Sequence, residues 1–269
     1  MKRAIFFLYR LLFAYPFFYR LNYYLYCLAL RGMGILNYEN STVSGERRFL
    51  KRVGSYFNNP VIVDVGCNEG AYATLCKEKC PGASVYGIEP HPQTYARLLP
   101  LAERFGFMVF QYAVNDKEAE LTLYDYADKD GSSHASLYSD VIPELHGSTP
   151  KSTVVPAVSL DYFLQTNGIE RVNLLKIDTE GHELKVLQGA KKYLEAGKID
   201  IIHFEFNQMN TISRTFMRDF YEILKDFDFY RLLPRHLLPL GPYSPAMSEI
   251  FLFHNNIAIN KRISHSFPK

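Results

Sequence analysis

The sequence contains no tryptophan and no acidic residue before Glu39. Its four cysteines, Cys27, Cys67, Cys76 and Cys80, are too few for a disulfide framework in 269 residues. They also lack the paired short spacings of a zinc site. The cysteines therefore predict no metal site, and they indicate buried or reduced thiols in a reducing, cytoplasmic compartment.

A long uninterrupted apolar run is also missing. Near the N-terminus, Arg10 and Arg20 break the hydrophobic pattern, and Pro16 would kink a helix. No small-residue cleavage site follows. We therefore expect neither a signal peptide nor a spanning helix, which needs about 20 apolar residues.

Charge is nearly balanced in total but unevenly placed. The chain has 30 basic and 28 acidic residues, a net charge of +2, which argues against a nucleic-acid partner. Five of the 30 basic residues lie in the first 38 positions, which leaves 25 basic against 28 acidic residues, a net charge of −3, in the rest. The five are Lys2, Arg3, Arg10, Arg20 and Arg31.

Residues 1–50 form a basic, aromatic leader, and residues 51–269 form the predicted catalytic domain. At about 100° per residue, the five cations of the leader gather on one side of a helix. Such a helix is typical of a membrane-surface anchor, which would make the protein peripheral at the membrane through residues 1–31. The alternative is that the leader packs on the body with its arginines solvated. The sequence makes no prediction of oligomeric state.

From Pro60 onward, short apolar runs alternate with helical stretches, which predicts an α/β, doubly wound parallel sheet. Ligands of such sheets bind at the carboxyl ends of the strands, near the topological switch point. Residues 120–126 suggest a small β extension, and residues 128–153 read as a long loop. The main predicted strands are 61–65, 84–88, 107–112, 172–177, 199–206, 229–233 and 250–253 with 257–259, and the predicted helices are 70–79, 93–104, 159–165, 182–196 and 215–227.

A nucleoside-binding pattern follows the first two strands. The first runs into Asp64-Val-Gly-Cys-Asn-Glu-Gly70, where Gly66 and Gly70 permit a tight turn at the start of a helix. Nineteen residues later, Glu89 ends the second strand, where an acid can accept hydrogen bonds from both ribose hydroxyls. The alternative is a structural turn with a solvated Glu89.

The details of the turn favour S-adenosylmethionine over a dinucleotide. Asn68 replaces the middle glycine of the dinucleotide fingerprint, and the final glycine comes one residue early. Asp64 adds a carboxylate just before the turn. An anionic pocket suits a cationic ligand with an amino-acid end, so we predict S-adenosylmethionine as the cofactor.

Three motifs carry a family resemblance, and a fourth segment, Phe204-Glu-Phe-Asn207, adds to it. They are Asp64–Gly70, Ile88-Glu-Pro-His-Pro92 and Leu175-Lys-Ile-Asp-Thr-Glu-Gly-His-Glu183, which continues to Leu187-Gln-Gly-Ala190. Over about residues 58–255 the chain resembles the FkbM family of S-adenosylmethionine-dependent methyltransferases. The resemblance implies a class I methyltransferase, Rossmann-like fold, here with an N-terminal helical extension. It also implies methyl transfer to a hydroxyl, often on a sugar or natural product.

The resemblance assigns cofactor contacts by position. The turn would hold the methionine end, Glu89 would bind the ribose beside Pro90, and His91 with Pro92 would shape the floor. Two residues after the third strand would lie near adenine, although no acid–aromatic pair follows them. The implied cofactor residues are Asp64, Gly66, Asn68, Gly70, Glu89, Pro90, Val114 and Asn115.

The acceptor side needs a group that takes the hydroxyl proton. Asp178, at the end of the fourth strand, is the leading base, and His182 is the alternative. Glu180 would bind a substrate hydroxyl. The competing interpretation is that Glu180 and Glu183 are first-turn acids that favour a helix N-terminus.

Three nearby residues have other expected roles. Glu205 could join Asp178 and Glu180 in holding a divalent cation, an alternative that we do not adopt. Lys176 is expected to be the partner of one of these acids, and His203 a satisfied core histidine.

Acceptor specificity is expected from two polar segments, residues 128–150 and 232–247. The first contains Ser132, Ser133, His134 and Ser136, and the second contains Arg235, His236 and Tyr243.

The sequence thus predicts an S-adenosylmethionine-dependent O-methyltransferase that acts on a sugar, a glycan or a natural-product-like acceptor. A lipid-linked sugar at the cytosolic membrane face would suit the leader. One alternative is an NAD- or nucleotide-sugar-binding Rossmann enzyme. Another is a catalytically inactive, membrane-associated binding protein of the same fold.

Overall fold

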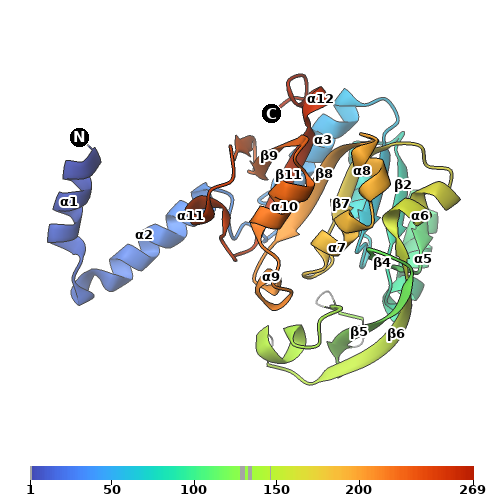
Figure 1. The fold of residues 1–269 in the computed structure, drawn as a ribbon, viewed down its shortest axis with the longest axis horizontal. Coiled ribbons are helices and arrows are strands. Elements are labelled where there is room, and N and C mark those ends of the chain that lie inside the picture. The colour runs from blue at the N-terminus through green and yellow to red at the C-terminus, as the bar shows by residue number, and fades with distance from the viewer. Residues whose placement is uncertain (1, 128–130, 133–134, 146) are drawn as a thin grey trace.

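The computed structural model describes residues 2–127, 131–132, 135–145 and 147–269. Its main sheet has the strand order β10-β9-β11-β8-β7-β1-β2-β3 (Figure 1). The five strands from β3 to β8 are parallel, whereas β11 is antiparallel to both neighbours and β10 is antiparallel to β9. The strands are β1 (Val61–Val65), β2 (Ser84–Ile88), β3 (Met108–Phe110), β7 (Val172–Ile177), β8 (Ile199–Phe206), β9 (Phe227–Leu232), β10 (Leu237–Pro239) and β11 (His254–Asn260).

Helices cover both faces of this sheet because its central strands are apolar on both sides. In β1, for example, Val63 and Val65 enter one core layer and Ile62 enters the other. The doubly wound α/β fold expected of a class I methyltransferase is therefore confirmed, but the prediction of a parallel sheet is wrong for β10 and β11, which are antiparallel to their neighbours. One face carries α6 (Leu160–Thr166), α7 (Glu183–Gln188), α8 (Lys191–Glu195) and α10 (Met217–Ile223), and the other carries α3 (Glu46–Tyr56), α4 (Ala71–Lys79), α5 (Pro92–Phe105) and α12 (Lys261–Ser264).

The strand order reverses direction at β1, which lies between β2 and β7. Asp64 of β1 stands opposite Gly87 of β2 on one side and Lys176 of β7 on the other. The carboxyl ends of these strands therefore form the switch point, where a ligand site is expected.

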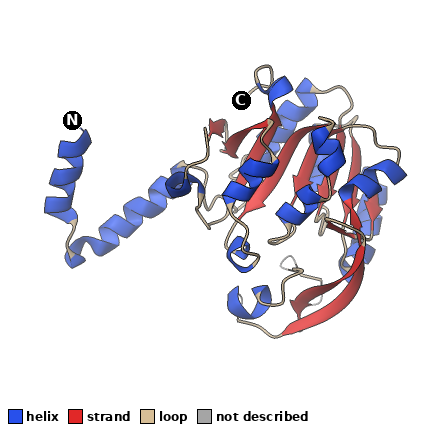
Figure 2. Cartoon of the chain, in the orientation of Figure 1, coloured by secondary structure: helices blue, strands red, loops and turns tan. Residues whose placement is uncertain are grey.

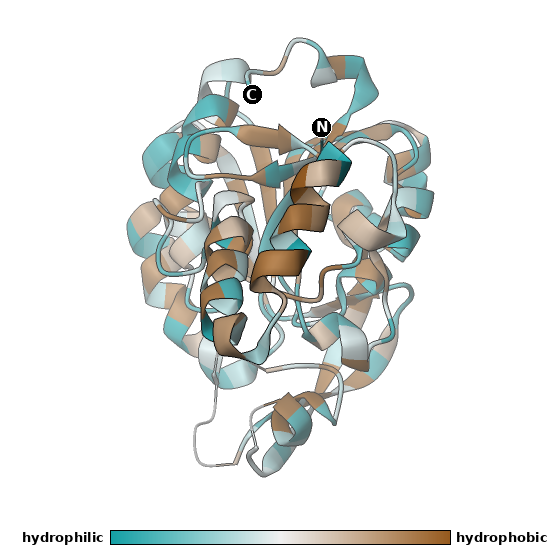
Figure 3. Ribbon diagram, turned by 90° about the vertical axis from the view of Figure 1, so that its left-hand side faces the viewer, coloured by the Kyte–Doolittle hydropathy of each residue, from teal (hydrophilic) through white to brown (hydrophobic). Residues whose placement is uncertain are grey.

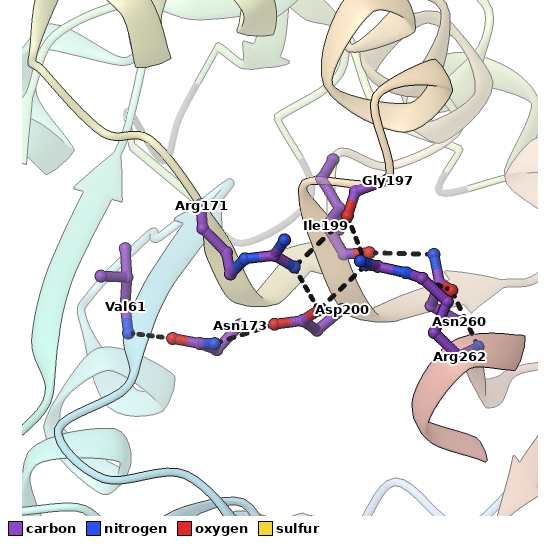
Figure 4. A network of polar contacts seen from close by, with 8 residues as sticks. All are labelled: Val61, Arg171, Asn173, Gly197, Ile199, Asp200, Asn260 and Arg262. Atoms are coloured by element: carbon purple, nitrogen blue, oxygen red, sulfur yellow. Dashed lines mark hydrogen bonds and ion pairs between the residues drawn. The ribbon is translucent and has the colours of Figure 1, made fainter. Parts of the chain in front are cut away.

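The opposite, amino-terminal edge of the sheet is held by a polar network (Figure 4). The buried carboxylate of Asp200 accepts hydrogen bonds from Arg171 at 2.7 Å, Asn173 at 2.9 Å and Arg262 at 3.3 Å. Asn173 in turn accepts one from the Val61 amide at 2.9 Å. The network ties β1, β7, β8 and α12 together, far from the switch point.

A second, three-stranded sheet has the order β4-β6-β5. Its strands are β4 (Ala113–Asn115), β5 (Ala119–Tyr126) and β6 (Pro150–Ser159), and the helical turn η2 (Val141–Leu145) lies between the last two. The β extension at 120–126 is confirmed, but the prediction of a loop over 128–153 is wrong in its last residues. Pro150 is tolerated as the first residue of β6, and the polar residues Lys151, Ser152 and Thr153 that follow it resemble a loop in sequence.

Two further predictions differ from the structure. The helix expected over 182–196 divides at Gly189, where a Cβ would lie 2.0 Å from the carbonyl oxygen of Asn115. Residues 250–253 are not a strand; β11 begins at His254. The remaining short helices, α9 (Met209–Ile212) and α11 (Pro245–Ser248), were not expected.

Residues 2–32 project from the body as α1 (Lys2–Phe13), η1 (Pro16–Phe18) and α2 (Tyr19–Gly32) (Figure 1, Figure 2). None of the described side chains of α1 is buried, and α2 buries only Leu30. Among the described residues, no single helix is both long enough and apolar enough to cross a bilayer, although α1 with residues 16–32 meets those criteria as a pair bent by 99°.

The rest of the predicted leader belongs to the body. Ile35, Phe49 and Leu50 are fully or almost fully buried. The boundary expected at residue 50 therefore falls inside α3, and the projecting part ends at Gly32. We call residues 2–32 the leader helices.

Candidate functional site

A cavity of about 1060 Å³ opens at the carboxyl ends of β1, β2, β7 and β8. Residues 36–47 and the second sheet supply two further walls. Nine of the eleven predicted site residues line it, namely Asp64, Gly66, Asn68, Glu89, Pro90, Val114, Asp178, Glu180 and His182, whereas Gly70 and Asn115 do not.

The turn after β1 requires its two glycines. Gly66 has a φ of 82°, and a Cβ there would lie 1.7 Å from the carbonyl oxygen of Asp178. Gly70 has a φ of 77° at the N-cap of α4, and a Cβ there would lie 2.5 Å from Leu98. Both positions favour glycine because a left-handed backbone strains other residues. Gly70 thus shapes the turn from behind the cavity wall.

The Glu89 carboxylate is fixed by two backbone amides. Its Oε2 accepts from the Asn68 amide at 2.9 Å, and its Oε1 accepts from the His91 amide at 2.8 Å. Burial, only partly offset by these bonds, raises the pKa of Glu89 to about 7. Each oxygen keeps a lone pair for a ligand, so Glu89 can accept hydrogen bonds from ribose hydroxyls.

Asp64 is 1% exposed, and its Oδ2 has no hydrogen-bond partner among the described residues. Burial raises the pKa of Asp64 to about 7, although nearby Lys176 opposes the shift. The Oδ1 of Asn68 also lacks a partner within the described part of the chain. Unpartnered buried acceptors are costly, and a ligand with a cationic, hydrogen-donating end would satisfy both.

Only one of the two residues expected near adenine, Val114 and Asn115, lies in the cavity wall. Val114 of β4 lines the cavity, together with Tyr112 and Ala113. Asn115 instead binds within the protein: its Oδ1 lies 3.1 Å from Nε2 of His182, and its Nδ2 donates to the Lys117 carbonyl at 3.2 Å. A direct contact of the Asn115 side chain with adenine does not follow from this geometry.

The acceptor side centres on a lysine between two carboxylates. The Lys176 ammonium lies 3.2 Å from Oδ2 of Asp178 and 3.5 Å from Oε1 of Glu205. The predicted partnership of Lys176 with an acid is confirmed, and it involves two acids. The Asp178 side chain is 33% exposed and that of Glu205 only 13%, so Asp178 is the more accessible carboxylate.

A cation site at these acids has no support in the geometry. The Lys176 ammonium already supplies a positive charge between Asp178 and Glu205. Across the described residues, no group of three or more His, Cys, Asp or Glu side chains is arranged to hold a metal ion.

Glu180 and His182 line the cavity in different electrostatic states. Glu180 has a φ of 51°, and burial together with Asp178 raises the pKa of its carboxyl well above the usual range. Burial and Lys185 lower the pKa of His182 to about 4, so its ring is neutral at pH 7. A neutral carboxylic acid can donate a hydrogen bond to a sugar oxygen, whereas His182 is a weak base.

Glu183 organises the loop that carries these residues. Its Oε1 accepts from the Thr179 amide at 3.0 Å, the Thr179 hydroxyl at 3.1 Å and the Gly181 amide at 3.1 Å. Its Oε2 accepts from Asn210 at 3.3 Å. This geometry agrees with the interpretation of Glu183 as a structural first-turn acid.

Some residues of the cavity wall were not predicted from the sequence motifs. Tyr72 of α4 presents its ring 5.7 Å from the Lys176 ammonium and its hydroxyl 3.0 Å from Nδ1 of His203. His203 is fully buried and also bonds Asn255 at 2.8 Å, as predicted for a satisfied core histidine. Glu46 lines the cavity from the start of α3. Neither Tyr72 nor Glu46 stands beside a strand end, so no local sequence pattern indicated that either residue would line the cavity.

Only the first expected specificity segment reaches the cavity. Ser132 lines it, and Ser136 donates to the Glu180 carbonyl at 2.9 Å. Ser133 and His134 lie outside the described residues. The second segment contributes nothing to the lining: Arg235, His236 and Tyr243 lie elsewhere, and Leu252 and Phe253 line the cavity instead.

Comparison with protein families decides the affiliation. The family profile described as the methyltransferase FkbM domain matches residues 64–231, from the end of β1 to β9. The chain belongs to the FkbM methyltransferase family. The matched range contains every predicted cofactor residue and the three predicted catalytic residues, Asp178, Glu180 and His182.

Three curated relatives of this FkbM chain carry methyltransferase names. Hexuronic acid methyltransferase AglP of Haloferax volcanii is 27% identical over 53% of this chain and 54% of its own length. Methyltransferase sdnD of Sordaria araneosa is 29% identical over 49% of this chain and 61% of its own length. 2-O-methyltransferase NoeI of Sinorhizobium fredii is 25% identical over 66% of this chain and 76% of its own length. The chain thus spans little more than half of AglP and sdnD.

Among solved structures, a precorrin-6y C5,15-methyltransferase of Geobacter metallireducens aligns with a TM-score of 0.42 and 9% identity. The alignment covers 84% of this chain and 94% of that one.

Proposed function

We propose that this FkbM protein is an S-adenosylmethionine-dependent O-methyltransferase that acts on a hydroxyl of a sugar or glycan. The observation that carries the proposal is the buried pair Asp64 and Glu89, which stands beside the acceptor carboxylate Asp178 in one cavity. The family match supports methyl transfer, and the names of AglP and NoeI support a sugar acceptor.

The chain offers complementary groups for this cofactor. The unpartnered Oδ2 of Asp64 would receive the ammonium of the methionine end, and Glu89 would hold the ribose hydroxyls. Val114 would pack on the adenine from the second sheet. S-adenosylmethionine, when bound, supplies an electrophilic methyl group to an aligned nucleophile.

Asp178 is the proposed general base. Its Oδ2 contacts Lys176, which leaves Oδ1 to accept the proton of the acceptor hydroxyl. Lys176 would hold the carboxylate in place, and Glu180 would orient a second sugar oxygen. Such proton transfer contributes about 10²–10⁴-fold to a rate.

Titration calorimetry and a radiolabelled transfer assay test the function together. We expect S-adenosylmethionine to bind and NAD not to bind, because the turn lacks the middle glycine of a dinucleotide site. Binding of NAD or a nucleotide sugar alone would favour the alternative Rossmann enzyme. Cofactor binding without transfer to any hydroxylated acceptor would favour an inactive binding protein.

We also propose that the protein is cytoplasmic and peripheral at a membrane, with residues 1–31 in contact with the lipid surface. The four free cysteines support a reducing compartment. The exposure of the leader helices supports surface contact.

A further inference from the structure

The leader helices expose an unusual amount of apolar surface. Phe6, Phe7 and Leu8 of α1 are 54–64% exposed, and Phe17 in the bend is 87% exposed. Figure 3 shows the hydrophobic colouring of α1 in front of the body. A contiguous apolar surface of this kind is unfavourable in water and marks a contact site.

The bend between the two helices is held by specific bonds. The Tyr9 hydroxyl donates to Oδ1 of Asn22 at 2.5 Å, and Nδ2 of Asn22 donates to the Phe13 carbonyl at 2.9 Å. Tyr9 also stacks on Phe13, with ring centroids 4.9 Å apart. The side chains of α1 and α2 therefore form one structured surface.

Charge identifies the partner as an anionic lipid surface. The five cations of residues 1–38 have no acid among them, so a second copy of this segment would meet the first with like charge. Anionic headgroups attract clustered Lys and Arg, and tyrosine favours the boundary between lipid and water. The leader helices contain six tyrosines, at positions 9, 15, 19, 23, 24 and 26.

The leader helices are joined firmly to the wall of the cavity. Immediately after α2, Ile35 forms a β-bridge with His254, and the Leu36 amide donates to the Phe253 carbonyl at 2.8 Å. Tyr38 packs edge-on against Phe253, with ring centroids 5.7 Å apart. Leu36, Tyr38 and Phe253 all line the cavity.

Conformational freedom at this junction is small. Gly34 has a φ of 79°, and a Cβ there would lie 2.7 Å from the Leu232 carbonyl oxygen. Asn37 donates to the Arg31 carbonyl at 3.1 Å, which closes the end of α2. A surface that binds the leader helices would therefore hold the cavity rim at a fixed position relative to that surface.

We infer that the leader helices dock on an anionic membrane and present the cavity to acceptors carried in the same membrane, which makes the acceptor a lipid-linked glycan. The inference rests on the proposed O-methyl transfer and names its substrate class. Confinement of enzyme and acceptor to one surface raises their effective concentration, and a water-soluble glycan would not gain from it.

The first test is flotation of the full chain with phosphatidylcholine vesicles that contain or lack phosphatidylglycerol. We expect the protein to float only with vesicles that contain phosphatidylglycerol. The fraction that floats should fall at least tenfold when three leader charges are reversed or two apolar leader side chains are replaced. Equal behaviour of all variants would overturn the inference. The variants are Lys2→Glu with Arg3→Glu and Arg10→Glu, and separately Phe7→Ser with Leu8→Ser; the matched control reverses exposed Lys191, Lys192 and Lys225 of the body.

The second test supplies radiolabelled S-adenosylmethionine with either the total lipid extract or the aqueous extract of cells that naturally contain the protein. We expect label in the lipid extract, at least tenfold less with the charge-reversed leader, and unchanged binding of the cofactor by that variant. Label in the aqueous extract alone would overturn the lipid-linked acceptor and leave the proposed methyl transfer standing. No label in either extract despite cofactor binding would overturn both.

Discussion

The backbone at Gly66 lies against the carbonyl oxygen of Asp178, so closely that a Cβ on Gly66 would stand 1.7 Å from it. The Asp178 amide also donates to the Val65 carbonyl at 2.9 Å. The cofactor turn after β1 and the acceptor loop after β7 are therefore one packed unit. Under the proposed function, this contact brings the methyl donor and the general base together.

Gly66→Ala tests this contact, and Gly106→Ala is its matched control. Both glycines have positive φ, 82° and 71°, but a Cβ at Gly106 meets nothing within 4 Å. We expect Gly106→Ala to lower the free energy of unfolding by about 1–2 kcal/mol through backbone strain alone. Gly66→Ala adds overpacking and should cost roughly 3–5 kcal/mol. Urea denaturation and calorimetry check both; equal costs would contradict the close packing.

Asp64→Asn should separate cofactor binding from stability. Burial raises the pKa of Asp64 to about 7 from 3.8, so the free protein loses stability as pH rises from 3.8 to about 7. Asn removes that cost, and we expect the free variant to be more stable at pH 8 by on the order of 1–3 kcal/mol. Affinity for S-adenosylmethionine should fall at least tenfold. Exposed Glu103→Gln is the control and should change neither quantity.

Cofactor affinity should depend on pH near neutrality. The carboxyl groups of Asp64 and Glu89 have pKa values of about 7 and are largely protonated at pH 6. The ligand ammonium favours the ionised form of Asp64, and the ribose hydroxyls donate to the ionised form of Glu89, so affinity should rise on the order of tenfold between pH 6 and pH 8. Binding at pH 7 should release protons, which calorimetry in buffers of different ionisation enthalpy detects. Affinity that is flat across this range would show that Asp64 does not bind the ammonium and that Glu89 does not bind the ribose as a carboxylate.

Asp178→Asn should stop transfer while sparing the cofactor site. The side chain keeps its shape but loses the ability to accept a proton, so we expect kcat to fall about 10²–10⁴-fold. Affinity for S-adenosylmethionine should change less than threefold. His182→Gln is the comparison: a histidine with a pKa of about 4 is a weak base at pH 7, so its loss should cost less than tenfold. The reverse order of effects would make His182 the base.

Much of the site was predictable because its residues follow strands that end at one edge of the sheet. Asp64, Glu89 and Asp178 each stand at or near the end of a recognisable apolar run. The glycine turn was predictable from the sequence because Gly66 and Gly70 supply the positive φ angles that the turn requires. The second sheet was predicted only in part, because β6 pairs with β5 across a long connection and begins with the polar residues Lys151, Ser152 and Thr153.

The sequence by itself determined the order of strands, turns and acids, since local periodicity and turn chemistry encode these features. Only the tertiary structure decided which side chains meet. It placed Lys176 between Asp178 and Glu205, bound Asn115 to His182, and made residues 36–47 a wall of the cavity. These contacts join segments up to about two hundred residues apart, so they depend on how strands pair and layers pack. No pattern within a single segment contains that information.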